Sequence, residues 1–356
     1  MNQNFNIQAF EDMQNQHFEN FDNAQLQNNE EDEQPRNDAF AAEAILEEQN
    51  DRYMQVLCNF NCIQFTTLFN IVGPRLIQAH TGGKKSVYSP RTIFLITLTY
   101  LKNAPPFNFM SMQFGRSVPY LSSLIAETVA ICAPLLAKAF IKWISIEEYV
   151  KNHCLFRNFP QCVCAVDASV QEIPRPKENQ KEFYSGKHHF HCLKVQAAVG
   201  PIGLAVNING PYAGSIHDFK IFKELSDTKF FINAEKDNYQ RAHPGELTVS
   251  ALFDKGYIGV NSVIAEPQLP KKKPYGRELT DDEKDYNDRI AQDRIIVERW
   301  FGRLKRIWKI MFICFPLKIE RYRDFYMMCA ALTNYHIQCN PLTNGDPIDP
   351  FRYEDD

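Results

Sequence analysis

The sequence predicts an α/β fold in which a mixed β-sheet domain follows a small all-α region and an acidic tail. Residues 1–40 are rich in Asn, Gln, Asp and Glu and show no sustained period. Apolar residues recur at helical spacing over 41–150, and short β-rich runs alternate with helices over 160–340. Residues 341–356 are expected to form a frayed C-terminal tail.

The N-terminal tail is predicted to be disordered, because its composition cannot bury enough apolar surface to offset the entropy lost on ordering. Residues 1–48 carry twelve acidic residues and one basic residue, Arg36, which gives a charge of −11. Since the whole chain carries −4, residues 49–356 carry +7. A basic body fits a nucleic-acid partner, although many basic domains bind nothing anionic.

The sequence indicates an intracellular protein with no membrane span. No apolar run reaches the roughly 20 residues that a bilayer requires, because the run after Ser122 is interrupted by Glu127, Pro134 and Lys138. The start lacks a basic stretch followed by an apolar core, so no secretory signal is expected. The ten cysteines are then expected to be reduced thiols that act as small buried apolar groups.

The helical region has the outline of a helix-turn-helix. A helix predicted over 91–102 ends before Pro105, and a short helix over 110–114, a turn at 115–119 and a helix over 121–132 follow. Two helices joined by a glycine-containing turn are typical of this DNA-binding motif. A plain helical bundle that packs on the next domain is the alternative, because the second helix has no basic residue before Cys132.

Beyond Gln161 the chain shows five apolar runs with the length and composition of β-strands, of which the second and third are joined by a hairpin turn at 200–202. These strands are predicted at 162–167, 191–199, 203–209, 247–254 and 263–267.

Two helices are predicted among these strands. One covers 218–225. The other opens with a capping box at Thr280 and Glu283 and continues to about Trp308. One face of the long helix is apolar, through Ile290, Val297, Phe301, Leu304 and Trp308. The order of strand, hairpin, helix, strand, strand and helix is that of an RNase H-like fold.

Three acidic residues stand where such a fold would place an active site. Asp167 ends the first predicted strand, Asp254 ends the fourth, and Glu298 lies in the long helix beside its buried stripe. Clustered carboxylates repel one another, and divalent cations such as Mg²⁺ relieve that repulsion. Two such ions about 4 Å apart can promote phosphoryl displacement. Taken singly, each acid also has a structural interpretation, such as a pair between Glu298 and Arg294.

Basic residues surround the third acid. These residues would contact DNA phosphates beside the proposed metal ions. Lys187, in the segment before the second predicted strand, would also contact a phosphate. Trp300 is expected to be part of the core, as is its neighbour Phe301. The basic residues of the long helix predicted to contact DNA are Arg299, Arg303, Lys305, Arg306 and Lys309.

The stretches over 183–222, 253–259 and 295–310 together resemble the DDE transposases of the PIF/Harbinger group and their bacterial insertion-sequence relatives. The resemblance covers roughly 160–340 and implies a DDE superfamily endonuclease. It implies that the catalytic and metal-binding acids are Asp167 in AVDAS, Asp254 in FDKGY and Glu298 in VERWFGRLK.

The same resemblance implies a two-ion site for Mg²⁺ or Mn²⁺, cleavage of DNA at terminal inverted repeats, and integration at a target site. A homo-oligomer is expected. For a eukaryotic member, the resemblance also implies nuclear localisation and a Myb-like DNA-binding partner.

Three further features are interpreted in structural terms or left open. Asp218 in GSIHD is also a family position, and we predict that it caps a helix rather than binding metal, with an accessory role as the alternative. The 43 residues between Asp254 and Glu298 include a basic loop around Lys272, which could contact DNA, serve in nuclear import, or be a solvated surface. The histidines at 188, 189 and 191 are expected to be polar or phosphate-contacting residues rather than metal ligands.

The sequence therefore favours a transposase-type nuclease that hydrolyses DNA to a free 3′-hydroxyl and then transfers the strand. A domesticated, non-transposing DNA-binding or chromatin-associated protein on the same scaffold is the alternative. The presence of all three acids favours the enzyme.

Overall fold

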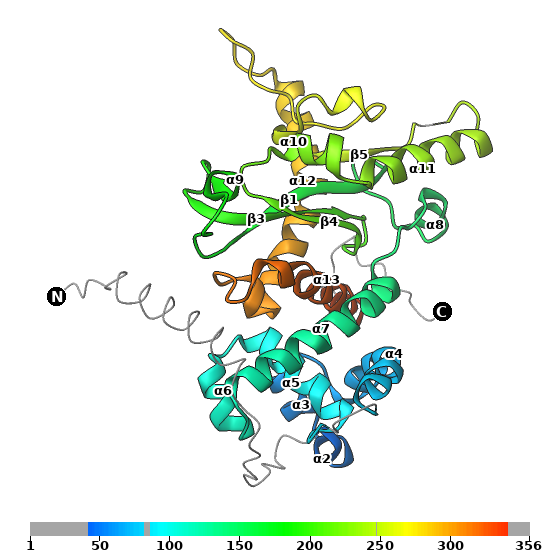
Figure 1. Cartoon of the computed structure of the whole chain (residues 1–356). Coiled ribbons are helices and arrows are strands. Elements are labelled where there is room, and N and C mark those ends of the chain that lie inside the picture. Colours follow the sequence, from blue (N-terminus) through cyan, green and yellow to red (C-terminus); the bar gives the residue numbers. More distant parts are fainter. Residues whose placement is uncertain (1–41, 82–85, 247, 341–356) are drawn as a thin grey trace, which may run out of the picture.

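A computed structural model of the chain describes residues 42–81, 86–246 and 248–340. The predicted tails at 1–40 and 341–356 lie outside the described residues. In Figure 1 a group of helices lies below a β-sheet, and α13 lies between them. The helices before β1 are α2 (Ala42–Glu47), α3 (Asp51–Cys58), α4 (Cys62–Thr81), α5 (Pro90–Asn103), α6 (Phe107–Phe114), α7 (Val118–Phe140) and α8 (Ile146–Lys151), of which α8 lies beside the sheet near α11.

The two helices of the predicted helix-turn-helix are present, as α6 and α7, and Gly115 ends α6 in a left-handed conformation with φ 58°. However, α7 is the central helix of the region and packs against α4, α5, α6 and α13. A helix buried to this extent presents little surface to a DNA groove, which favours the alternative of a bundle that packs on the next domain. A DNA-reading role for α7 stays a prediction.

Helix α7 is longer than the sequence suggested. It was expected to end near Cys132 but continues through Pro134 to Phe140. By length and composition alone it could cross a membrane, as could α3 and α4 if their bent pair is taken as one span. Half of the most apolar stretch of α7 is buried inside the protein, as is usual for the central helix of a folded core.

The sheet has five strands in the order β4-β3-β1-β5, with the short β2 also paired to β3. The β1–β3 and β3–β4 pairs are antiparallel and the β1–β5 pair is parallel. This mixed α/β arrangement was predicted from the order of elements and is consistent with an RNase H-like domain. The strands are β1 (Cys162–Glu172), β2 (Tyr184–Ser185), β3 (Phe190–Val199), β4 (Ala205–Ala213) and β5 (Ser250–Phe253).

Two strand predictions were wrong. Strand β1 continues to Glu172, so Asp167 lies in its middle rather than at its end. The strand predicted over 263–267 is absent: the chain forms the 3₁₀-helix η5 (Val260–Ser262), and Gln268 then makes a single bridge to Leu252. Val260 and Ile264, four residues apart, are both buried, so this run packs as a helical turn.

Helices cover both faces of the sheet. The long helix, α12, packs against β1, β3 and β5, and α13 packs against β4. The capping box at the start of α12 was predicted correctly, since the Thr280 and Glu283 side chains each bond to the backbone of the other residue. Buried residues of α7 belong to the same core as those of α12. Buried residues of η3 and α11 belong to the core on the opposite face of the sheet. The helices of this part are α9 (Gln180–Phe183), α10 (Asp218–Lys220), the π-helix η3 (Ile221–Leu225), α11 (Thr228–Ala242), η4 (Lys255–Tyr257), α12 (Asp281–Ile307), η6 (Lys309–Met311), η7 (Ile319–Arg321) and α13 (Tyr322–Cys339).

The cysteines and aromatic residues behave largely as expected. All ten cysteines are free thiols, and seven of them are buried. Trp300 and Phe301 are both part of the core. Burial raises the pKa of the Cys58 thiol to about 12, so this group stays protonated and inert.

Candidate active site

The first two candidate acids follow paired residues on adjacent parallel strands. Val166 of β1 pairs with Phe253 of β5, so Asp167 and Asp254 each come one residue after the pair. Asp167 lies on the face of the sheet that α12 covers, because side chains alternate along a strand and Ala165 packs in that core. The sheet register therefore brings together two carboxylates that are far apart in the sequence.

Asp167 is surrounded by opposing influences. One carboxylate oxygen accepts a hydrogen bond from the Ala168 N–H at 2.8 Å, and the other lies 3.1 Å from an Arg294 guanidinium nitrogen. Burial raises the pKa of Asp167 to about 6 although these two contacts favour the charged form. The negative charges of Asp254 and Asp218 add to the rise.

Arg294 joins the first and third acids. One guanidinium nitrogen contacts Asp167, and another contacts Glu298 one helical turn further along α12. The pairing of Glu298 with Arg294, which the sequence offered as a structural interpretation, is thus present. It is not an isolated surface pair, because the Arg294 side chain is only 16% exposed and also reaches β1. Two carboxylates from different elements converge on one cation.

Asp218 lies in the same site, but the prediction that it caps a helix was wrong. His217 is the cap of α10 and accepts from the Phe219 N–H. The Asp218 carboxylate instead pairs with the Lys194 ammonium at 2.8 Å. It also faces Gly256, where an added Cβ would lie 3.6 Å from an Asp218 oxygen and 3.9 Å from an Asp254 oxygen. Asp218 is therefore a neighbour of Asp254.

A buried tyrosine lies close to the three aspartates. Tyr257 is fully buried, and its hydroxyl accepts a hydrogen bond from the Gln196 side-chain N–H at 3.0 Å. Burial raises the pKa of Tyr257 far above its usual value, and the charges of Asp167, Asp218 and Asp254 raise it further. The hydroxyl therefore stays protonated.

The donor set fits a hard divalent cation in its chemistry. Carboxylate oxygens are the ligands that Mg²⁺ and Mn²⁺ prefer. Asp167 and Glu298 already share one cation, the Arg294 guanidinium, so their carboxylates are placed to stabilise positive charge between them. Across 42–81, 86–246 and 248–340, however, no three His, Cys, Asp or Glu side chains stand close enough together to hold a metal ion.

The residues predicted to contact DNA differ in exposure and in their contacts with the rest of the protein. Lys187 is exposed in the turn between β2 and β3. The Lys305 ammonium donates to the Val170 carbonyl of β1 at 3.1 Å, on the same sheet face as the acids. Arg303 instead contacts His336 of α13 at 3.0 Å, which indicates a packing role. Three further basic residues on this part of the chain are exposed, namely Arg299, Arg306 and Lys309.

The histidines of the β2–β3 turn form ring contacts. His188 lies against Phe190, and His191 lies edge-on to Tyr184. Burial lowers the pKa of His188, and the positive charges of Lys187 and Lys194 lower it further. The lowered pKa favours the neutral form of the His188 imidazole, so the positive charge beside it comes from the two lysines.

Sequence reasoning missed two cations of the site. Lys194 received no role, and Arg294 was considered only as a partner of Glu298. The four-residue spacing of Arg294 and Glu298 was a usable signal, because it places both side chains on one helix face. No local signal linked Lys194 to Asp218, which follows it by 24 residues.

A mixed sheet with carboxylates on β1, directly after β5 and on a covering helix is consistent with an RNase H-like nuclease domain. Residues 166–334 match the family model of the DDE superfamily endonucleases. It is also 32% identical over 172 residues to a protein of Microchaete diplosiphon described as a probable transposase for insertion sequence element IS702. The predicted resemblance to DDE-type transposases is thereby confirmed. Membership of the PIF/Harbinger group stays a prediction.

The similarity to the Microchaete diplosiphon protein covers 48% of this chain and 56% of that protein. No solved structure matches the chain. The family match starts within β1 and therefore leaves out the helices before it.

Proposed function

We propose that the chain is a transposase-type endonuclease that hydrolyses a DNA phosphodiester bond to a free 3′-hydroxyl and then joins that end to a target strand. The observation that carries the proposal is the convergence of Asp167, Asp254 and the Arg294–Glu298 pair in a domain that matches the DDE superfamily endonucleases.

In this proposal, Asp167, Asp254 and Glu298 hold two Mg²⁺ or Mn²⁺ ions. When bound there, such ions would supply a charge that activates the attacking oxygen and stabilises the leaving 3′-oxygen. Asp167 acts in its ionised form, which burial disfavours below about pH 6. Arg294 holds Asp167 and Glu298 near each other before the site is loaded, and it releases them on loading. Asp218 is neutralised by Lys194 and serves as an accessory acid next to Asp254.

The proposed substrate is DNA, both at the transposon ends and at the target site. Lys187, Lys305 and the exposed Arg299 and Arg306 are proposed to contact its phosphates, and Arg303 contributes by fixing α12 to α13. Action as a homo-oligomer, a Myb-like accessory protein and location in the nucleus of a eukaryotic host are further parts of this proposal.

The test is nicking of supercoiled plasmid DNA by the purified full-length protein with Mg²⁺ or Mn²⁺. Asp254→Asn is expected to lower the nicking rate on the order of a thousandfold, because it removes a charged ligand from the ions that carry the chemistry. Asp288→Asn changes an exposed acid of α12 outside the site and is the matched control. Nicking that is unaffected by Asp254→Asn, or that persists in excess EDTA, would overturn the proposed site.

A second candidate is a DNA-binding protein on the same scaffold that no longer cuts. The observation that favours it is the Arg294 guanidinium, which pairs with both Asp167 and Glu298 and so occupies the place where these carboxylates would bind a metal ion. This candidate is supported if wild type and Asp254→Asn bind DNA equally and neither nicks it, even when the ends of the element are supplied.

A further inference from the structure

A basic segment projects from the α/β domain next to the start of α12. Residues 270–279, here named the arm, have no helix or strand and extend away from the sheet at the top of Figure 1. The side chain of Tyr275 near its tip is fully exposed, and the adjacent Gly276 has φ 80°, which turns the chain back. The arm carries Lys271, Lys272, Lys273 and Arg277 against one acid, Glu278.

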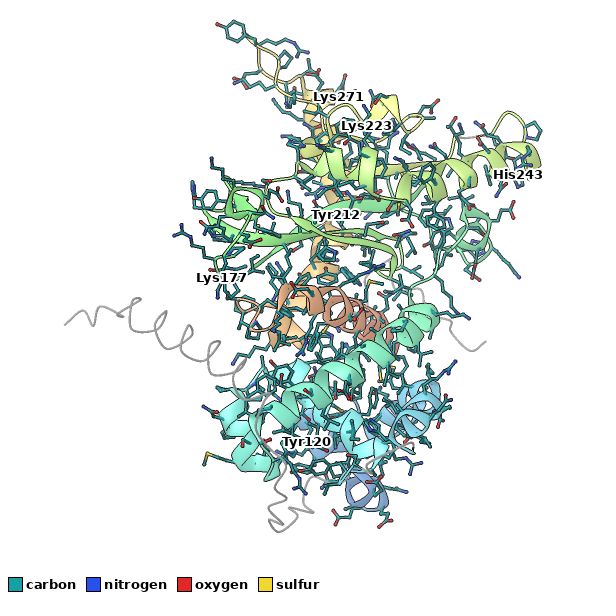
Figure 2. The ribbon with its side chains drawn as sticks, in the orientation of Figure 1. Tyr120, Lys177, Tyr212, Lys223, His243 and Lys271 are labelled. Carbon is teal, nitrogen blue, oxygen red and sulfur yellow. The ribbon has the colours of Figure 1, made fainter. Side chains whose placement is uncertain are left out.

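The arm is held at its entry to the first turns of α12. The Lys271 N–H donates to the Asn287 side-chain oxygen at 2.6 Å, and the Asn287 side-chain N–H donates to the Lys271 carbonyl at 3.1 Å. The Lys271 ammonium also lies over the Tyr286 ring, 5.2 Å from its centre. Figure 2 labels Lys271 at the base of the projecting segment.

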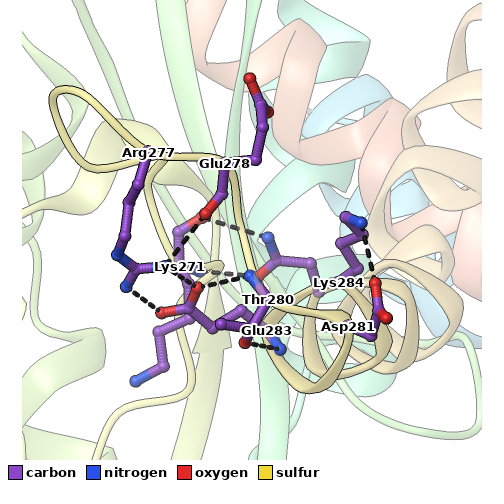
Figure 3. Close-up of polar contacts among 8 residues, drawn as sticks. Lys271, Arg277, Glu278, Thr280, Asp281, Glu283 and Lys284 are labelled. Atoms are coloured by element: carbon purple, nitrogen blue, oxygen red, sulfur yellow. Dashed lines mark hydrogen bonds and ion pairs between the residues drawn. The ribbon is translucent and has the colours of Figure 1, made fainter.

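At its exit the arm is held by charge. Arg277 donates two hydrogen bonds to the Glu283 carboxylate, at 2.8 and 2.9 Å, and Glu283 closes the capping box with Thr280 (Figure 3). The hydrogen bond from Arg277 lowers the pKa of Glu283 to about 2, so the pair stays charged near neutral pH. With both ends tied to α12, the arm is a fixed projection.

The contacts within the arm leave two side chains at its tip available to a partner. Lys273 pairs with Glu278, and Arg277 pairs with Glu283. Lys272 and Tyr275 make no hydrogen bond, ion pair or ring contact with any other described residue, and both are exposed. An anchored projection that presents an aromatic ring and a free ammonium has the two groups with which proteins contact nucleic acids.

We propose that the arm is a second DNA contact, in which Lys272 binds a backbone phosphate and the Tyr275 ring packs against a base or sugar. This inference rests on the proposed function, because it needs DNA at the carboxylates. The arm ends where α12 begins at Asp281, and the helix from there to Glu298 is about 25 Å long. For DNA that runs along α12, this length corresponds to about seven base pairs between the arm and the cut phosphate. The arm carries four basic residues against one acid, and this excess of positive charge favours a polyanion such as DNA as its partner.

The experiment measures binding of the full-length protein to a labelled duplex of about 30 base pairs by fluorescence anisotropy over a range of salt concentrations. Tyr275→Ala is expected to weaken binding on the order of tenfold with the melting temperature unchanged. Lys272→Ala is expected to lower the slope of log K against log salt by about 1. Phe230→Ala removes a ring that is 65% exposed on α11 and is the matched control, with no expected effect.

A second probe, the same duplex with one unpaired end, identifies what the ring contacts. A larger loss for Tyr275→Ala on the unpaired end supports stacking on a base, and an equal loss supports contact with the duplex backbone or groove. The arm has no DNA role if wild type binds and nicks DNA and both arm variants bind as tightly as wild type. The same conclusion follows if the variants change only the particle mass in light scattering, which would assign the arm to contact between copies. Failure of wild type to bind or nick DNA removes the proposed function and the inference together.

Discussion

At the scale of single residues, Asp167 combines a cost in stability with its proposed role. Its pKa in the folded chain is about 6, against 3.8 for a free side chain. The folded state therefore binds the proton more tightly than the unfolded state. This contribution favours folding below about pH 4 and is lost as the pH rises through about 6. Above that pH, the ionised carboxylate destabilises the metal-free protein by about 2 to 3 kcal/mol.

Asp167→Asn is expected to stabilise the metal-free protein by about 2 kcal/mol at pH 7.5 and by about half as much at pH 5, because the amide cannot ionise. The same change is expected to abolish nicking. Urea unfolding in EDTA at the two pH values provides the measurement. A loss of stability of equal size at both pH values would show that the contact with Arg294 outweighs the cost of burial.

At the scale of secondary structure, the site depends on how α12 is fixed to the sheet. Asp293, one residue before Arg294, is buried and accepts from the backbone N–H groups of Asn158 and Phe159 at 2.9 and 3.0 Å. It also accepts from the Asn158 side chain at 3.0 Å. These bonds join α12 to the segment that leads into β1, and they set the position of Glu298 relative to Asp167.

Asp293→Ala is expected to lower the free energy of unfolding by about 3 kcal/mol, because two backbone donors lose their acceptor in a buried place. Nicking is expected to fall in the variant that remains folded, because Glu298 is no longer held opposite Asp167. The control is Asp288→Ala, an exposed acid of the same helix, with an expected change within about 0.5 kcal/mol. Equal stability of the two variants in urea unfolding would contradict the proposed anchoring.

At the scale of the whole molecule, α13 connects the helical region to the sheet. The buried Asn334 side chain accepts from the Trp300 ring N–H and the Ala205 N–H, and it donates to the Phe140 and Ala205 carbonyls. These four bonds join α12, β4 and the end of α7. The hydrophobic core continues from the helical region into the α/β domain. There the Phe60 ring packs against the Trp308 ring, with 6.1 Å between the ring centres.

Asn334→Ala is expected to cost about 3 kcal/mol, because it leaves several buried polar groups without partners. Since the core is shared, far-UV circular dichroism and tryptophan fluorescence are expected to report one coincident unfolding transition for wild type. Asn340→Ala, at an exposed position after α13, is the control. Two separate transitions in wild type would show instead that the helical region and the α/β domain unfold independently.

Features that depend on local periodicity and capping could be predicted from the sequence. The strands β1, β3, β4 and β5 and the capped helix α12 with its buried face were all predictable, and the three acids could be assigned to these elements. Three features of the site became visible only in the folded chain: Asp167 lies within β1, Asp218 pairs with Lys194, and Arg294 lies between two of the acids. The tertiary structure also placed α13, which the sequence did not predict, between the helical region and the sheet. The physical reason is that Asp167 and Arg294 are 127 residues apart. Their contact depends on strand register and helix packing, which a local pattern does not encode.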